Sequence, residues 1–90
     1  MKVVLSTVLD FDSLEDLAAA CVDCVENFYL DSSSDDGVPN NWDDPEVWDE
    51  ETITDFLMYN GYYFIQEQGI DPECDLFNDN FSTTRVELKE

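Results

Sequence analysis

Apolar residues recur at two spacings in the first third of the chain, and each spacing predicts one kind of element. The run KVVLSTVL over 2–9 is rich in β-branched and apolar residues, which is typical of a strand covered on at least one side. Over 13–30 the apolar residues follow at intervals of three and four, which indicates a helix with one buried face. Asp12 is expected to cap this helix, with Glu15 three residues later.

A loop and a second helix are expected in the middle of the chain. Ser, Asp, Gly, Pro and Asn are concentrated over 31–43, and these residues favour turns. A helix is then expected over 45–68, with Asp44 as its cap, acids in its first turn and Gly69 after its end. The segment 49–52 could break this helix into a short first turn and a longer main segment.

The end of the chain completes the predicted fold. Residues 72–77 look like one turn of helix, and the alternating run over 81–88 favours a closing strand. Pairing of this strand with the first would bring together all the bases of the chain, Lys2, Arg85 and Lys89. Residues 1–90 are therefore expected to form a single α+β domain of order β-α-loop-α-β, with a two-stranded sheet packed on two amphipathic helices.

The charge of the chain is extreme for its size. There are 23 acidic residues and three bases, which gives a formal net charge of −20 over 90 residues. No base lies between Lys2 and Arg85, so most carboxylates there lack an intramolecular cation and repel one another. Solubility of a small domain needs a net charge of only about 2–8. The excess of acid therefore needs another reason.

The acids are densest from Trp42 onward, in the sequence WDDPEVWDEETITDF. Helical residues three or four positions apart stand about 5–6 Å from one another, so Glu46 with Glu50, and Glu51 with Asp55, would form a regular array of charge. Aromatic residues often dominate the energy of an interface, which makes the two tryptophans of this stretch candidate anchors. The expected partner-binding residues are ten acids, named here the acidic surface (Asp31, Asp35, Asp36, Asp43, Asp44, Glu46, Asp49, Glu50, Glu51 and Asp55), together with Trp42 and Trp48.

Residues for catalysis are scarce. Histidine is absent, which removes the commonest general base and metal ligand near neutral pH. There is also no Gly-rich phosphate loop and no nucleophile elbow. We therefore expect no enzyme activity, no cofactor and no dedicated metal site. Cys21 and Cys24 form a CxxC that could be a redox pair, or half of a zinc site completed by Cys74, but a mid-helix position in acidic surroundings favours simple packing.

The helix–loop–helix order also invites comparison with a calcium-binding EF-hand. Alignment of Gly37 with the glycine of such a loop places Ser32, Ser34 and Asp36 at ligand positions and Asp43 at the last one. Serine then replaces the first aspartate, and aspartate replaces the bidentate glutamate. At most weak calcium binding is expected, as in a structural or calcium-buffering protein.

In its size, charge, lack of bases and interleaving of Asp and Glu with Trp and Tyr, the chain resembles the small phage-encoded proteins that mimic DNA, which include anti-restriction and anti-CRISPR proteins. The resemblance covers the whole chain and is one of composition and pattern. It implies an inhibitor that occupies the basic groove of a DNA-binding protein and does not bind nucleic acid itself. The alternative is an acidic–aromatic module for a basic protein, such as a histone-like protein or a chaperone client. A homodimer through exposed aromatic residues is a further expectation.

The sequence also favours a cytoplasmic location. The N-terminal apolar run is followed by no small-residue cleavage site, and no apolar run approaches the about 18 residues of a membrane span. Three cysteines is an odd number, whereas secreted disulfide scaffolds normally use an even one. We therefore expect no membrane partner and a reducing cytoplasm, which for a phage-encoded protein is that of the host cell.

Overall fold

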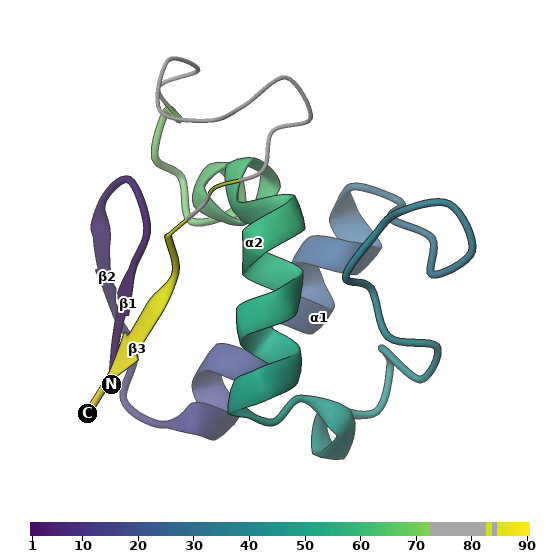
Figure 1. Ribbon diagram of the computed structural model, residues 1–90, viewed down its shortest axis with the longest axis horizontal. Helices are drawn as coiled ribbons and strands as arrows, with labels where there is room; N and C mark the ends of the chain where they lie inside the picture. Colours follow the sequence, from purple (N-terminus) through teal and green to yellow (C-terminus); the bar gives the residue numbers. More distant parts are fainter. Residues whose placement is uncertain (73–82, 84) are drawn as a thin grey trace.

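In the computed structural model, which describes residues 1–72, 83 and 85–90, the chain forms a three-stranded sheet and two main helices (Figure 1). The elements in chain order are β1 (Lys2–Val4), β2 (Val8–Asp10), α1 (Leu14–Asn27), the short 3₁₀ helix η1 (Pro45–Val47), α2 (Glu50–Glu67) and β3 (Glu87–Lys89). The sheet order is β2-β1-β3, and both strand pairs are antiparallel. The expected α+β class is confirmed, whereas the expected two-stranded sheet is wrong.

The additional strand arises because the predicted strand over 2–9 folds back on itself. β1 and β2 form a hairpin in which Val4 lies opposite Val8. Within the bend, the backbone N–H of Leu5 donates to the carbonyl of Thr7 at 2.9 Å. The bend contains no Gly, Pro or Asn, the residues that usually mark a hairpin turn, and apolar residues continue on both sides of it. The turn therefore could not be predicted from the sequence pattern.

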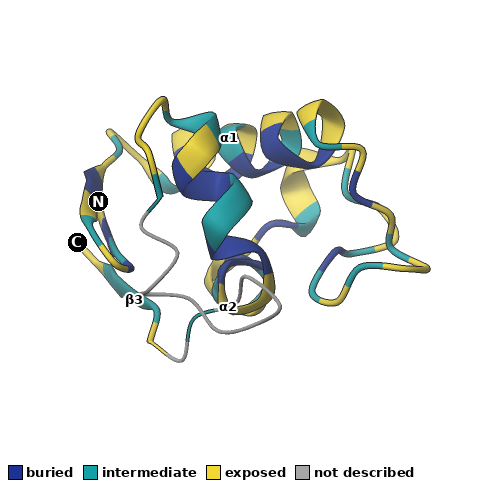
Figure 2. Ribbon diagram, turned by 90° about the horizontal axis from the view of Figure 1, so that it is seen from above, coloured by how far each residue is buried: buried dark blue, intermediate teal, exposed yellow. Residues whose placement is uncertain are grey.

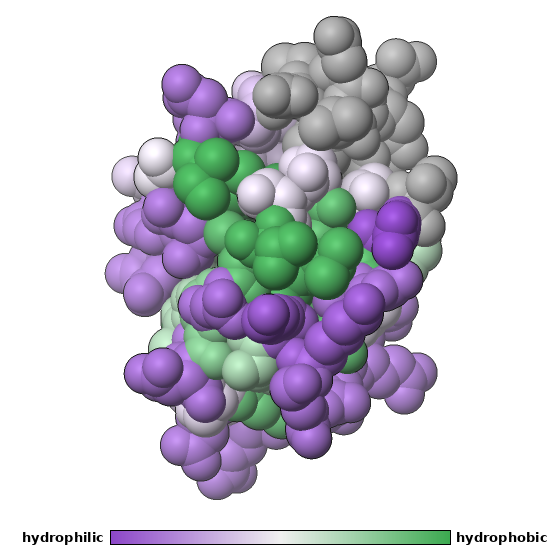
Figure 3. All heavy atoms as spheres, turned by 90° about the vertical axis from the view of Figure 1, so that its left-hand side faces the viewer, coloured by the Kyte–Doolittle hydropathy of each residue, from purple (hydrophilic) through white to green (hydrophobic). Residues whose placement is uncertain are grey.

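The sheet has one face toward the helices and one toward solvent. Val3 of the central strand is fully buried, and it lies opposite Leu9 on one side and Leu88 on the other. The neighbouring residues along each strand point the other way, so Val4 and Val8 lie on the outer face. Viewed from the sheet side, apolar side chains gather near the centre of the surface, with hydrophilic residues around them (Figure 3).

The core lies between the sheet, α1 and α2, and the buried stripes of the two helices face each other (Figure 2). Leu17, Cys21 and Val25 of α1 are all buried, as the intervals of three and four predicted. Phe56 and Phe64 are the largest fully buried side chains. Burial of one such ring stabilises the fold by about 1.5–3 kcal/mol. The core therefore holds α2 firmly, together with the residues that α2 carries on its exposed side.

The first helix is shorter at both ends than the sequence predicted. Ser13 is the N-cap in place of Asp12, and its hydroxyl oxygen accepts a backbone N–H of the first turn at 3.3 Å. At the other end, Tyr29 adopts a φ of 54°, in the left-handed region. The N–H of Leu30 then donates back to the carbonyl of Val25 at 3.0 Å, which is the hydrogen bond of a Schellman stop. Leu30, which follows this stop, is also buried. Apolar periodicity therefore could not locate the end of the helix.

The second predicted helix is divided, and the break foreseen at 49–52 falls at the start of that range. Asp44 caps η1, and Asp49 caps α2. Gly69 follows α2 with a φ of 80°, which confirms the predicted end. Inside α2, Asn60 has the non-helical angles φ −125° and ψ 23°, so the helix is kinked there.

Two sequence predictions concern the end of the chain. β3 occupies 87–89 and pairs with β1, but most of the strand predicted over 81–88 precedes it, and residues 81, 82 and 84 lie outside the described residues. The predicted turn over 72–77 lies outside them too, apart from its first residue. Within the part that the structure describes, no helix is long and apolar enough to cross a bilayer.

A candidate acidic interaction surface

The loop between the two helices is attached directly to α2. Gly37 has a φ of 82°, and a Cβ built at this position would lie 2.9 Å from the carbonyl oxygen of Asp55 and 3.1 Å from the Tyr59 ring. Only glycine lets the backbones approach this closely without strain. Val38, the next residue, is buried. The loop predicted over 31–43 is therefore packed onto a helix.

A buried asparagine reinforces this attachment. The Asn60 side-chain Nδ2 donates to the carbonyl of Asp36 at 2.8 Å and to the carbonyl of Phe56 at 3.2 Å. Asn60 is the one polar residue in the core among the described residues, and a buried amide deprived of its partners would cost free energy. The two bonds therefore fix the loop at Asp36 and place it beside the turn of α2 that carries Asp55.

The two tryptophans hold η1 against the core. Trp48 is only 2% exposed, and its ring packs edge-on against Phe56, with ring centroids 5.1 Å apart. Its indole Nε1–H donates to the carbonyl of Trp42 at 2.8 Å. The expectation that Trp48 serves as a contact anchor is therefore wrong, since its face and its N–H are already used inside the protein. Trp42 is half-buried and retains some free surface.

The ten carboxylates of the acidic surface lie outside this packed framework. Nine of them are exposed, and Asp35 is half-buried. Glu51 and Asp55 share α2, so the helical spacing expected for them applies. Glu46 and Glu50 lie on η1 and α2, on either side of the break, so the helical spacing expected for that pair is wrong. The surface is therefore built from a loop, a short turn and the beginning of a helix.

Four of these carboxylates are fixed by backbone hydrogen bonds. Asp49 Oδ1 accepts the N–H of Thr52 at 2.8 Å, and Asp44 Oδ1 accepts the N–H of Glu46 at 3.0 Å. In the loop, Asp31 Oδ1 accepts from both the N–H and the hydroxyl of Ser33 at 2.9 Å, and Asp35 Oδ2 accepts the N–H of Asp31 at 2.8 Å. These acids shape the backbone and carry charge at the same time.

The hydrogen bonds also keep two of the acids ionised. The backbone N–H of Ser33, and then its hydroxyl, lower the pKa of the Asp31 carboxyl below its ordinary value. The backbone N–H of Thr52, and then its side chain, lower the pKa of Asp49 in the same way. Hydrogen bonds to the charged form of a carboxyl favour that form. Both groups therefore stay anionic to a lower pH than an aspartate without such hydrogen bonds.

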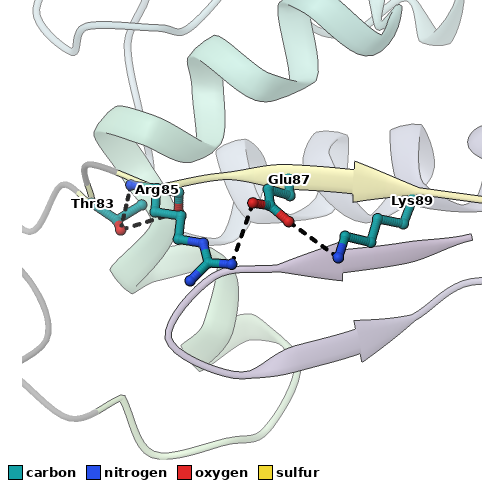
Figure 4. Close-up of polar contacts among 4 residues, drawn as sticks. All are labelled: Thr83, Arg85, Glu87 and Lys89. Atoms are coloured by element: carbon teal, nitrogen blue, oxygen red, sulfur yellow. Dashed lines mark hydrogen bonds and ion pairs between the residues drawn. The ribbon is translucent and has the colours of Figure 1, made fainter.

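Two of the bases, Lys2 and Lys89, lie on the sheet, and Arg85 lies just before β3. Lys2 lies opposite Lys89 in the strand register, as the sequence predicted for a paired closing strand. Glu87 Oε1 lies 3.3 Å from Arg85 Nη2, and Glu87 Oε2 lies 3.3 Å from Lys89 Nζ (Figure 4). These are the ion pairs within residues 1–72, 83 and 85–90, so none of the ten acidic-surface carboxylates is paired with a described cation.

The described residues offer little support for a metal site or for a reactive cysteine pair at Cys21 and Cys24. No group of three or more His, Cys, Asp or Glu residues there could hold a metal ion. Cys21 and Cys24 are fully buried on α1. Burial raises the pKa of the Cys21 thiol well above its ordinary value and that of Cys24 to about 12. Both thiols are therefore protonated packing groups near neutral pH, and Cys74 lies outside the described residues.

The roles of two residues near the acidic surface, Asn60 and Tyr29, could not be identified from the sequence. Asn60 lies in the middle of a helical stretch, where only its burial reveals that it holds the loop. Tyr29 is 91% exposed, and it borders a shallow hollow at the C-terminal end of α1. The apolar pattern gave no sign of an exposed ring at this position. Its left-handed φ is uncommon for a residue other than glycine, asparagine or aspartate.

Comparison with known proteins gives no relative for this chain: no family model, no curated protein and no solved structure matches it.

Proposed function

We propose that this protein mimics DNA and inhibits a DNA-binding protein by occupying its basic groove. The observation that carries the proposal is a set of ten carboxylates that have no described cation partner and are attached to a packed framework. A disordered acidic tail would have to be ordered on binding, at a cost in free energy. A framework that already holds its charges avoids much of that cost.

The arrangement of the loop on α2 supports this proposal. Gly37 and Asn60 bring the loop acids to the helix, so charges distant in sequence act as one surface. A groove that binds DNA neutralises phosphates with Lys and Arg and releases counterions. An anionic surface carried on a packed framework would interact with the same side chains. The inhibitor would have no catalysis of its own and would not bind nucleic acid.

The decisive experiment is competition with duplex DNA. The protein is used to capture partners from a lysate of the host cell, and each captured protein is then tested for release by duplex DNA at physiological salt. We expect to capture a partner that is released from the protein in proportion to the duplex DNA added. A partner that stays bound at saturating DNA would refute mimicry and would favour the acidic–aromatic module for a basic protein.

Charge variants test whether the acidic surface makes the contact. The triple variant Glu50→Gln, Glu51→Gln, Asp55→Asn removes three charges and leaves the Asp49 cap intact. Its matched control, Glu15→Gln, Asp16→Asn, Asp23→Asn, removes three charges from α1. We expect partner affinity to fall at least tenfold more in the first variant, since each lost phosphate-like contact removes a salt-dependent contribution. Equal losses in both variants would mean that net charge alone matters.

The expected homodimer through exposed aromatic residues remains a prediction. Tyr29 and Tyr59 are the exposed aromatic side chains of the described residues, at 91% and 47%. Measurement of the mass in solution for the protein and for a Tyr59→Ser variant would test it.

A further inference from the structure

The C-terminal end of α1 borders a shallow hollow that joins the helix to the loop. It is lined by Val25, Glu26, Tyr29, Leu30, Asp31 and Trp42. Its floor is apolar, since Val25 and Leu30 are buried core residues, and its rim carries two carboxylates and two aromatic rings. A long side chain with an apolar stem and a charged end would cover the floor and reach the rim.

The electrostatics of the hollow favour a cation. Glu26 and Asp31 each carry a carboxylate, and the hydrogen bonds from Ser33 hold the side chain of Asp31 in place. The last turn of α1 contains no base, so the negative end of the helix dipole, about half an elementary charge, is not compensated within that helix. Three sources of negative potential therefore meet at one place.

The two aromatic side chains suit a planar cation. Tyr29 is almost entirely uncovered, and its backbone is fixed by the helix stop that it forms. Trp42 is half-buried, and its carbonyl accepts the Trp48 indole N–H, so its backbone is anchored to the core. A guanidinium group stacks on aromatic faces and is less strongly hydrated than an ammonium group. Arginine is therefore a better fit than lysine.

We infer that this hollow binds the guanidinium group of an arginine on the partner protein. The inference rests on the proposed function only for the source of the arginine, because a groove that contacts DNA phosphates is rich in this residue. It assigns a specific role to Asp31 of the acidic surface and to three residues beside it, Glu26, Tyr29 and Trp42. The remaining acids contribute long-range attraction, and the hollow fixes one side chain at short range.

The binding test uses N-acetyl-arginine amide as the probe with the full chain. Two-dimensional NMR follows the backbone amides of residues 29–31 and the indole N–H of Trp42 during titration at physiological salt. We expect saturable shifts at these positions, with a dissociation constant of about 1 mM for a ligand of this size. N-acetyl-citrulline amide, which has the same shape without the charge, should cause no saturable shift. Shifts that spread evenly over the exposed acids without saturation would overturn the inference.

Variants of Tyr29 separate binding from folding. Tyr29→Gly removes the ring and also relieves the left-handed backbone, so we expect about fivefold weaker probe binding together with a higher melting temperature. Tyr29→Phe keeps the ring and should keep the affinity. Glu26→Gln should weaken binding more than Glu15→Gln, its matched control at the other end of α1. Unchanged affinity in Tyr29→Gly would overturn the role of the ring.

The outcomes also separate this inference from the proposed function. Saturable binding of the arginine probe with no DNA-competed partner would support the hollow and refute mimicry. A DNA-competed partner that is captured equally by Tyr29→Gly, with no probe binding, would support mimicry and refute the hollow.

Discussion

Substitution of Gly37 by alanine tests the attachment of the loop to α2. A Cβ at this position would lie 2.9 Å from a backbone oxygen of Asp55, and a backbone atom cannot turn aside as a flexible side chain can. Gly69 supplies a matched control, since its φ of 80° is nearly the same as the 82° of Gly37 and, among the described residues, no heavy atom beyond its chain neighbours lies within 4 Å of its virtual Cβ. The two substitutions therefore differ mainly in the contact.

The expected magnitudes follow from these two geometries. An alanine in the left-handed region costs about 1–2 kcal/mol at either position. At Gly37 the forced separation of loop and helix adds about 1–3 kcal/mol, as is usual for overpacking of a close contact. For a domain of this size, that extra cost corresponds to a melting temperature lower by about 4–8 °C per kcal/mol. The difference between the two variants is the quantity of interest.

The assay is urea unfolding followed by tryptophan fluorescence, because the burial of Trp48 against Phe56 reports directly on the packing of η1 and α2. Midpoints and slopes are compared at equal salt. Equal free energies of unfolding for Gly37→Ala and Gly69→Ala would refute the argument that the loop is packed on the helix. A loss of stability for Gly37→Ala with unaltered partner binding would refute the argument that loop position matters for function.

Three further predictions concern stability. Tyr29→Gly should raise the free energy of unfolding by about 1 kcal/mol in urea titrations, because glycine adopts the left-handed conformation without strain; a lower value would contradict the stop at Tyr29. Salt should raise the melting temperature by several degrees between about 10 mM and 100 mM NaCl, because the Debye length falls from about 30 Å to about 10 Å and screens repulsion between the unpaired carboxylates. Choline chloride is the control there, and an effect confined to sodium would contradict simple screening. Finally, the lowered pKa of Asp49 means that its contribution to stability is complete above the pKa of the unfolded chain and is lost as the pH falls through the folded pKa. Asp49→Asn keeps an acceptor for the Thr52 N–H, so the stability difference between wild type and this variant should shrink in acid; a difference that grows below about pH 4 would contradict the assignment.

The sequence could predict the elements that depend on local pattern. The buried stripe of α1, the cap at Asp44 and the glycine at 69 each follow from intervals and cap residues within a few positions. The hairpin over 2–10 could not be predicted in the same way, because its turn lacks the usual turn residues and its apolar residues continue on both sides. For the same reason the third strand of the sheet was not predicted.

The candidate site was predictable in composition but not in arrangement. The density of acids selected the ten carboxylates, of which nine are exposed and Asp35 is half-buried, and their contact with a partner stays a prediction. What brings the loop to the helix depends on contacts across 18 to 24 positions, from Gly37 to Asp55 and from Asp36 to Asn60. No local pattern contains such information. Trp48 was misassigned for a related reason: a tryptophan among acids looks exposed until its partner Phe56 is known.

The separation of charge between the sheet and the loop has a kinetic consequence. The sheet, which carries Lys2 and Lys89, and the loop lie on opposite sides of α2 (Figures 1 and 2), in a molecule 32 Å across its longest axis. Besides its net charge, the described part of the chain therefore has an electric dipole whose negative end is the loop. In the field of a cationic cleft the molecule would rotate so that this end leads and the sheet trails. Orientation before contact raises the fraction of productive encounters, and electrostatic steering of this kind can raise association rates to about 10⁸–10⁹ M⁻¹s⁻¹ at low salt.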